Sequence, residues 1–299
     1  MKKLRKMHLS FPKNKIIVAM LILAIGSLAC GITLTLPEDA ITTGPPVVDI
    51  IQIPAPSSGN TADLKLSFGT GKLIINPGEQ AELLAGTANY NVAELAPQII
   101  TVGSDIELKT GTFKYELTGL PNFTEIDNEW NLSFNQYPFT LEVRAGAFTG
   151  EFELGNLAIE ELRIFGGASR LNLNFASPNL LPMSYFHLTS GITTAELTGL
   201  ANANFSLFDF EGGGGNYLLD FSGFLQRDAT VDIKAGLSNI QIIVPEGIPA
   251  YINIEGTLKN VNASGVWIME GENYFQYGEG PGLTFNIDLG AGNLVLKNN

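Results

Sequence analysis

The chain has 299 residues, of which 45% are hydrophobic and 16% charged, with a formal net charge of -13. Six of the 17 Lys and Arg residues lie among the first fifteen, which leaves 11 bases against 30 acids, or -19, for the remainder. Because this acidic surface repels phosphate groups, we expect no nucleic-acid partner and no peripheral electrostatic binding to anionic lipid. The single cysteine, Cys30, leaves no thiols for a disulfide framework or a thiolate metal cage beyond it.

The N-terminal segment has the pattern of an export signal. Its basic tail up to Lys15 contains no acid, and residues 16–29 are uncharged and almost wholly apolar. Such a pattern is typical of a secretory signal whose positive end stays in the cytoplasm. Residues 1–30 are therefore a predicted signal peptide, and the rest of the chain is expected outside the membrane.

The end of this segment predicts how the chain is tethered. Ser27-Leu28-Ala29-Cys30 resembles a bacterial lipobox, although Ser27 and Leu28 depart from its preferred residues, and Cys30 would be the lipidated residue. Residues 16–36 are also long enough for an uncleaved membrane-spanning helix. Plain secretion after cleavage is a third alternative. The first two place the chain on the outer face of a bacterial cell membrane, held by an N-terminal lipid or helix.

Residues 31–62 differ in composition from the segments on either side. They are rich in Thr, Ser, Gly and Asn and contain five prolines: Pro37, Pro45, Pro46, Pro54 and Pro56. Proline-rich chain is extended and semi-rigid. We therefore predict a linker that holds a folded part away from the anchor.

From Asp63 onward, apolar and polar residues alternate. Clear examples are residues 64–68, 139–143, 171–175 and 285–289. Each run predicts a half-buried strand with one apolar face. Helical signals are limited to residues 91–95 and 158–162, where one or two turns are expected. The sequence therefore predicts an all-β fold.

The strands recur with a regular period. A strand, a glycine turn and a second strand repeat around Gly146, Gly166, Gly191, Gly213 and Gly236, at intervals of 20, 25, 22 and 23 residues. Such a period is typical of repeat architectures, and we expect the glycines to supply positive φ angles at tight corners. The favoured architecture is an elongated β-solenoid-like stack of short strands with glycine corners. A β-sandwich is the alternative.

Several glycine-containing motifs resemble a known family. FGTGKLIINPG from Phe68, LLAGTANY from Leu83 and the proline Pro97 resemble the N-terminal part of bacterial toast-rack proteins. The repeats that follow, and the final DLGAGNLVL, resemble the toast-rack body shared with LiaF-like envelope-stress proteins. The resemblance implies a toast-rack-like N-terminal domain over residues 63–125 and a β-repeat domain over residues 126–299. It also implies membrane tethering and a role in envelope sensing or scaffolding, without an assigned catalytic centre.

Residues suited to catalysis are scarce. The histidines are His8, inside the signal, and His187, which is expected to be a hydrogen-bonded structural residue. Glu151 and Glu153 alternate on one strand as a carboxylate pair, but in a chain with 30 acids a solvated surface is the favoured interpretation. We therefore predict a protein that is not an enzyme, with no catalytic residue, no cofactor and no metal site.

The best candidate binding surface is an aromatic cluster near the C-terminus. Trp267, Tyr274, Phe275 and Tyr277 are interleaved with glycines and glutamates. Exposed rings could stack on sugars or bind a partner protein. The alternative is that the rings cap the end of the repeat stack. Outward rings would favour binding, and inward rings would favour the cap.

Three functions from different classes remain. The favoured one is a non-enzymatic, membrane-tethered extracytoplasmic module that acts in envelope scaffolding or stress sensing through contacts with an envelope protein. The second is an adhesin or glycan-binding surface module, which needs exposed aromatic rings. A β-solenoid carbohydrate-active enzyme is the least favoured, because it needs two convergent acids in a cleft.

Overall fold

The computed structural model describes residues 43–56, 60–111, 126–256 and 260–298. These residues belong to one compact unit. The predicted signal, its lipobox-like end with Cys30 and the alternative anchor at residues 16–36 all lie outside the described residues. Within the described part, no helix is long and apolar enough to cross a membrane.

The described chain is almost entirely β-structure, as the sequence predicted. Two short 3₁₀ helices, η1 (Ala93–Leu95) and η3 (Leu200–Ala203), interrupt the strands. The strands are β1 (Val47–Ile53), β2 (Ala62–Pro77), β3 (Leu84–Tyr90), β4 (Pro97–Val102), β5 (Asp105–Thr110), β6 (Asn128–Phe134), β7 (Phe139–Glu153), β8 (Ile159–Asn174), β9 (Met183–Thr198), β10 (Phe205–Asp220), β11 (Ala229–Ile243), β12 (Ala250–Gly256), β13 (Val261–Ala263), β14 (Ile268–Glu270), β15 (Asn273–Gln276) and β16 (Leu283–Lys297).

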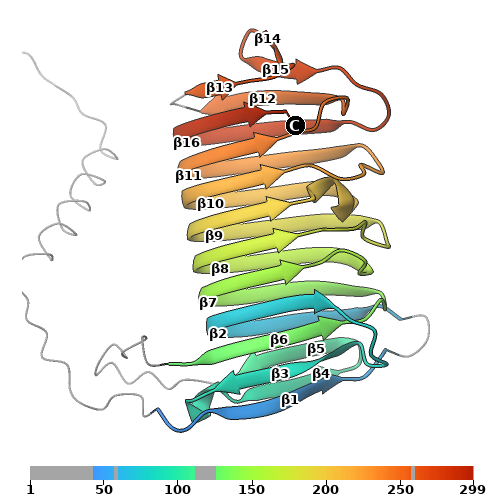
Figure 1. Cartoon of the computed structure of the whole chain (residues 1–299), viewed down its shortest axis with the longest axis vertical. Coiled ribbons are helices and arrows are strands. Elements are labelled where there is room, and N and C mark those ends of the chain that lie inside the picture. Colours follow the sequence, from blue (N-terminus) through green and yellow to red (C-terminus); the bar gives the residue numbers. More distant parts are fainter. Residues whose placement is uncertain (1–42, 57–59, 112–125, 257–259, 299) are drawn as a thin grey trace, which may run out of the picture. The chain divides into compact units, whose positions relative to one another are not determined.

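All of these strands belong to one sheet (Figure 1), whose main path runs β1-β3-β6-β2-β7-β8-β9-β10-β11-β16-β12-β15-β14. Neighbouring strands are parallel from β6 and β2 through to β16 and β12. Antiparallel strands complete both ends, with β3 and β1 at one end and β15 and β14 at the other. This is the predicted β-solenoid-like stack.

Each long strand folds back on itself at a glycine corner. In β7, Phe139, Leu141 and Val143 are buried before the corner, and Phe148 and Phe152 are buried after it. Since alternate residues of both halves are buried, the two halves face each other across one apolar core, as the front and rear ribbons of Figure 1 show. The strands predicted from alternation therefore have the expected faces. We call each folded strand a rung.

The corner glycines stack directly on one another. A Cβ on Gly146 would lie 2.6 Å from the carbonyl oxygen of Gly69, and one on Gly213 would lie 2.4 Å from that of Gly191. Along the stack these corner residues are Gly69, Gly146, Gly167, Gly191, Gly213, Gly236 and Gly290. The corners need glycine because the rungs approach closely there.

The expected positive φ angles are not found at these corners. None of the five glycines singled out in the repeat has a positive φ, and Gly167, not Gly166, occupies the corner of β8. Positive φ occurs two residues after the corner, at Gly71, Gly215 and Gly292. The repeat was located correctly from the glycines, but the physical reason for them was wrong.

The first and last long strands lie inside the stack. β2 lies between β6 and β7, and β16 lies between β11 and β12. In each case two separate short strands take the place of one folded strand as the covering layer. β5 and β6 pair with the two halves of β2, and β12 and β13 pair with the two halves of β16. Both ends of the parallel stack are therefore closed by chain that returns over them.

Two local predictions differ from the structure. Residues 158–162 were expected to form a helical turn, but β8 begins at Ile159 and buries Ile159 and Leu162. Residues 31–62 were expected to be a linker, but β1 lies within that range and pairs with β3. In both places, burial against the stack decides the conformation, and local composition does not.

Tyr90 joins β3 to the edge strand β1. Its hydroxyl donates a hydrogen bond to Asp49 Oδ2 at 2.7 Å, and its ring is buried. This hydrogen bond, together with burial and the negative charge of Asp49, raises the pKa of Tyr90 to about 12. The folded state therefore holds the phenolic proton more tightly than the unfolded state does.

We expect stability to fall in strongly alkaline solution for this reason. An unfolded tyrosine loses its proton near pH 10, whereas folded Tyr90 keeps its proton until about pH 12. The stabilisation is thus complete below pH 10 and is lost as pH rises through the folded pKa. Urea unfolding at pH 8 and pH 11 should show a larger loss for the wild type than for Tyr90→Phe. Equal losses in the two proteins would contradict this account.

Candidate functional site

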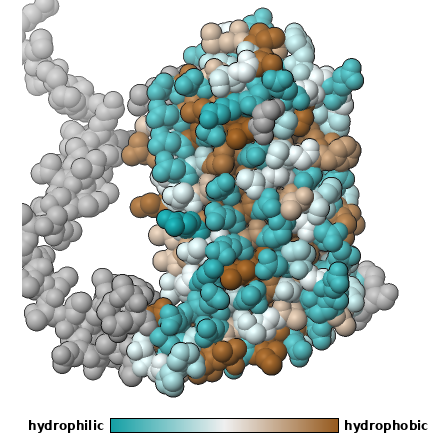
Figure 2. Space-filling view, viewed as in Figure 1, coloured by the Kyte–Doolittle hydropathy of each residue, from teal (hydrophilic) through white to brown (hydrophobic). Residues whose placement is uncertain are grey.

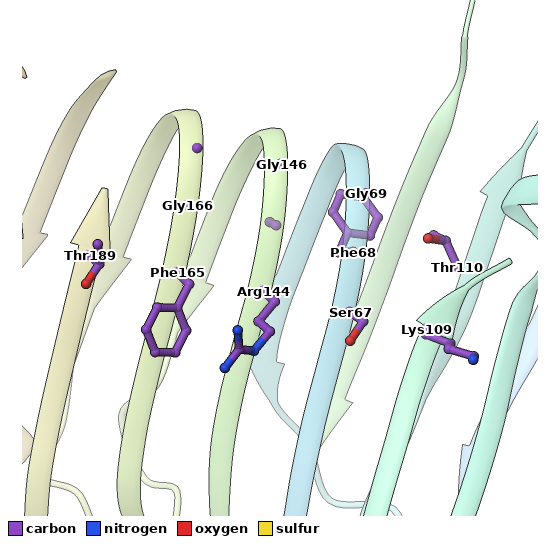
Figure 3. A pocket seen from close by; sticks show the side chains of 12 residues that line it. Ser67, Phe68, Gly69, Lys109, Thr110, Arg144, Gly146, Phe165, Gly166 and Thr189 are labelled. Carbon is purple, nitrogen blue, oxygen red and sulfur yellow. The ribbon is translucent and has the colours of Figure 1, made fainter. Parts of the chain in front are cut away.

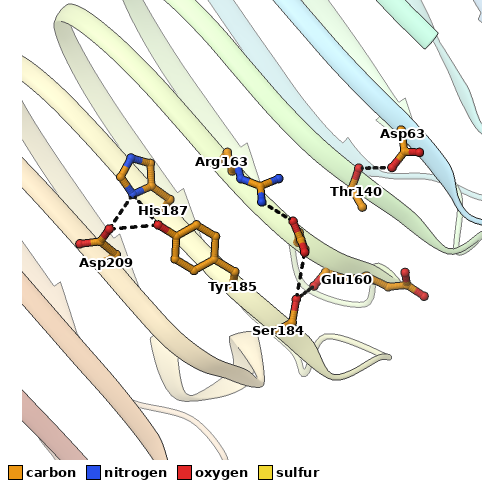
Figure 4. A network of polar contacts seen from close by, with 9 residues as sticks. Asp63, Thr140, Glu160, Arg163, Ser184, Tyr185, His187 and Asp209 are labelled. Atoms are coloured by element: carbon orange, nitrogen blue, oxygen red, sulfur yellow. Dashed lines mark hydrogen bonds and ion pairs between the residues drawn. The ribbon is translucent and has the colours of Figure 1, made fainter. Parts of the chain in front are cut away.

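The outer face of the first strand halves holds polar side chains in register across the rungs (Figure 4). Tyr185 Oη donates to Asp209 Oδ2 at 3.0 Å, and His187 Nδ1 lies 3.1 Å from the same oxygen. Arg163 pairs with Glu161 at 2.6 Å on the neighbouring rung. Burial, followed by the hydrogen bond to Asp209, raises the pKa of Tyr185. These side chains stabilise one another, as cross-strand pairs do.

His187 is the group on this face best suited to acid–base chemistry. Its Nε2 lies 2.6 Å from Thr189 Oγ1, so Thr189, His187 and Asp209 have the connectivity of a hydrolytic triad. However, β9 pairs with both β8 and β10 along this stretch, so its amide groups are engaged in the sheet. A triad also needs free donors for an oxyanion. The arrangement agrees with the structural role predicted for His187.

A shallow recess of about 500 Å³ lies beside the glycine corners on the same face (Figure 3). Arg144 and Phe165 line it, and the guanidinium lies 4.6 Å from the ring centroid. Arg144 is also ion-paired with Glu142. At one end Ser67 donates to Glu107 at 2.8 Å, and this hydrogen bond, then Lys65, lowers the pKa of Glu107. The polar groups of the recess therefore largely bind one another.

The outer face of the second strand halves is polar as well. Asn239 donates to Asn216 at 3.0 Å, and Asn293 donates to Asn239 at 2.7 Å, so asparagines form a ladder across adjacent rungs. Glu151 pairs with Lys72, and Glu153 accepts hydrogen bonds from two nearby backbone amides and from the side chain of Asn174. The carboxylate pair noted in the sequence therefore has structural partners on an open surface.

The predicted aromatic cluster lies at the end of the stack formed by β12, β15 and β14. Trp267 and Tyr274 are partly buried and pack against the hydrophobic core. Phe275 and Tyr277 line a groove, with ring centroids 5.5 Å apart, and Tyr277 is 77% exposed. The cluster thus divides: two rings face the core as a cap would, and two line an open surface.

The groove also includes residues that the sequence did not single out. Tyr251 on β12 is directly opposite Phe275 in the sheet register and is 44% exposed. The carboxylates of Asp228 and Glu270 line the same groove, which has a volume of about 710 Å³. We call the groove of Tyr251, Phe275, Tyr277, Asp228 and Glu270 the tip groove. Tyr251 was missed because only the antiparallel return of β15 places it beside the cluster.

The tip groove combines flat rings with hydrogen-bond acceptors. Aromatic rings stack on apolar ring faces, and carboxylates accept hydrogen bonds from hydroxyl or ammonium groups. Asp228 Oδ1 already accepts a hydrogen bond from the Gly282 amide at 2.8 Å, which fixes one wall of the groove. Among the described residues, no cluster of three or more His, Cys, Asp and Glu side chains could hold a metal ion.

Comparison with known proteins identifies the family. The family described as the N-terminal domain of toast_rack, DUF2154, matches residues 48–180. Residues 48–180 of this chain therefore form a toast-rack N-terminal domain. The match begins in β1 of the toast-rack domain and extends beyond β8. None of the curated proteins compared with the chain matches it in sequence.

Comparison with solved structures gives one neighbour of similar fold. A provisionally named cell adhesion protein from Clostridium sporogenes is 23% identical, with a TM-score of 0.50, over 85% of this chain and 100% of the other. A provisional adhesin from Bacteroides fragilis is 12% identical, with a TM-score of 0.35, over 85% and 97%. A provisional lipid-binding protein from Parabacteroides distasonis is 12% identical, with a TM-score of 0.34, over 83% and 96%. The first of these similarities supports the fold.

Proposed function

We propose that this chain is a non-enzymatic module, tethered to the outer face of a bacterial cell membrane, that works by contact. Its role is envelope scaffolding or stress sensing through a protein partner bound at the tip groove. The tether is the predicted lipid on Cys30 or the apolar helix of residues 16–36. The surface of partly exposed aromatic rings at one end of a rigid stack supports contact as the mode of action.

The observation on which the proposal rests is the position of the groove relative to the chain's entry. The chain enters the sheet at β1, and the tip groove lies on β12 and β15 at the other end of the strand order. The path from β1 to β14 has twelve inter-strand steps, or roughly 60 Å at ~4.8 Å each. An anchor before β1 would therefore join the sheet at the end of the strand order opposite the tip groove.

Site-specific photocrosslinking in intact cells tests this proposal. A photoreactive amino acid at Tyr277 is expected to capture a distinct envelope protein, and Tyr251→Ala in the same chain should abolish that capture. Ile50 on β1 is the matched control, because Ile50 and Tyr277 are both 77% exposed. Equal capture from both positions, or capture that survives Tyr251→Ala, would count against a partner site at the tip.

The exposed tyrosines also favour a second candidate, a glycan-binding adhesin. Tyr251 and Tyr277 could stack on pyranose rings while Asp228 and Glu270 accept hydroxyl hydrogen bonds. The same carboxylates disfavour acidic glycans by charge repulsion. This candidate therefore requires neutral or amino sugars as ligands.

We expect Tyr277→Ala to weaken such binding by about tenfold, the effect of losing one well-packed aromatic contact. The probes are neutral N-acetylhexosamine oligosaccharides, with a polyuronic acid as the acidic comparison. Binding is measured by titration of the full chain in detergent. Tyr137, partly exposed in the loop before β7, provides the control substitution Tyr137→Ala. Stronger binding of the acidic glycan, or equal losses in both variants, would exclude this candidate.

A further inference from the structure

The corner edge of the stack is an uncharged ridge. We use "glycine ridge" for the seven stacked corner glycines and the residue that follows each of them. In stack order the following residues are Thr70, Ala147, Ala168, Ile192, Gly214, Leu237 and Ala291. No position on this ridge has a charged side chain, although the chain contains 30 acids. An uncharged strip on an acidic protein is a candidate contact surface.

Two large aliphatic side chains project from this ridge. Ile192 is 75% exposed and Leu237 is 72% exposed. Gly214 lies between them, because it is paired in register with both. The order over these three rungs is therefore a large side chain, no side chain and a large side chain, at steps of ~4.8 Å. Figure 2 shows apolar side chains projecting from the edge where Figure 1 shows the strands folding back.

This order of sizes is complementary to itself. Consider a second copy turned end over end, with a two-fold axis between rungs β9 and β10. Ile192 of each copy then faces Gly214 of the other, and Leu237 faces Ala168. Ala147 and Ala291 also face each other, so every large side chain lies opposite a small residue. Moving the axis onto β10 would instead place Ile192 against Leu237 twice.

We propose that two copies of this chain pack ridge to ridge in this antiparallel register. A two-fold contact requires one patch to be complementary to itself, and the size order on the ridge meets that requirement. The sheet faces carry exposed acidic side chains such as Glu196 and Asp288, so two acidic copies repel each other there. Along the ridge, two copies approach without facing charges, and the glycine backbones permit close contact.

The ridge also determines the strength and geometry of this contact. Seven rungs extend about 30 Å, and so narrow a strip buries less than the ~800 Å² per partner of a stable complex. The association is therefore weak for one pair and grows when many pairs act together. In the antiparallel arrangement the two β1 ends point away from each other, which suits chains on facing surfaces. Only this last consequence rests on the proposed tether.

Disulfide crosslinking between differently tagged full chains in detergent tests the register. One chain carries Ala168→Cys and the other Leu237→Cys. After mild oxidation, this mixture should yield at least about tenfold more crosslinked dimer than two differently tagged copies of either single variant. The reason is that a disulfide requires Cα atoms within about 7 Å, which only the Ala168–Leu237 pair satisfies in the proposed register. The wild type measures any background from Cys30. The exposed positions of both substitutions predict unchanged melting temperatures for the variants.

Two controls make each outcome decisive. Ala147→Cys mixed with Ala168→Cys should not crosslink, because these residues lie about four rungs apart in the proposed register, or ~19 Å. Adding Ile192→Lys to both chains of the productive pair should reduce the mixed dimer to background, because it places a charge against Gly214. Crosslinking of Ala168→Cys with itself, insensitivity to Ile192→Lys, or no mixed dimer above background would each overturn the proposal.

Discussion

Replacing Gly213 with alanine is expected to destabilise the stack by at least about 3 kcal/mol, well beyond the effect of a typical surface substitution. The added Cβ would lie 2.4 Å from the carbonyl oxygen of Gly191 and 3.2 Å from its carbon. Both are backbone atoms of the adjacent rung, so no side-chain rotation relieves the clash. The neighbouring rungs would have to separate, and their parallel hydrogen bonds would weaken with them.

The adjacent glycine is a matched control for this experiment. A Cβ on Gly214 would meet only the carbonyl oxygen of Leu237, at an ordinary contact distance of 3.4 Å, and its φ is not positive. Gly214→Ala should therefore have no effect or stabilise by up to about 1 kcal/mol through the unfolded state. Urea unfolding of both variants measures the difference. Similar stabilities would show that the corner column tolerates side chains and that close stacking is not the reason for glycine.

We expect Leu173→Asp to cost more than about 4 kcal/mol, enough to prevent stable folding. Leu173 is 1% exposed and lies in the core on the second half of β8. A carboxylate there would be buried without a partner, which costs far more than the cavity left by a smaller apolar residue. Leu173→Ala should therefore fold with an intermediate loss of about 2 to 5 kcal/mol.

Arg170 provides the control for the introduced charge. It is exposed on the same strand half, opposite Thr149 and Thr194 on the neighbouring rungs. Arg170→Asp should change the free energy of unfolding by no more than about 0.5 kcal/mol, since its carboxylate remains in water. Circular dichroism melts of the three variants give the comparison. A folded Leu173→Asp chain with a near wild-type melting temperature would mean that the two strand faces are reversed.

Alternation and glycine spacing were sufficient to predict the fold class and the inward faces of the strands. Runs such as residues 139–143 and 285–289 alternate strictly because one side of each strand is buried in the core and the other faces solvent. The glycines recur because each rung must pass its neighbour at backbone contact distance. Both signals are local consequences of a repeated contact, so they survive in the linear sequence.

The tip groove could be predicted only in part. The cluster of Phe275 and Tyr277 is visible in the sequence because its members are close together in the chain. Tyr251 joins them only through the antiparallel pairing of β12 with β15, and Asp228 comes from a loop that is held by the amide of Gly282, just before β16. Whether an aromatic ring faces the core or solvent depends on what packs above it, so Trp267 and Phe275 could not be separated beforehand.

The sequence by itself determined that this protein is an acidic β-repeat chain with an apolar N-terminal segment, because composition and periodicity directly reflect solvent exposure. The tertiary structure decided that β2 and β16 lie inside the stack, that β1 belongs to the sheet and that the ridge residues form one line. These features depend on pairings between segments far apart in the chain. Such pairings are selected by the burial of the whole core, and no local pattern encodes them.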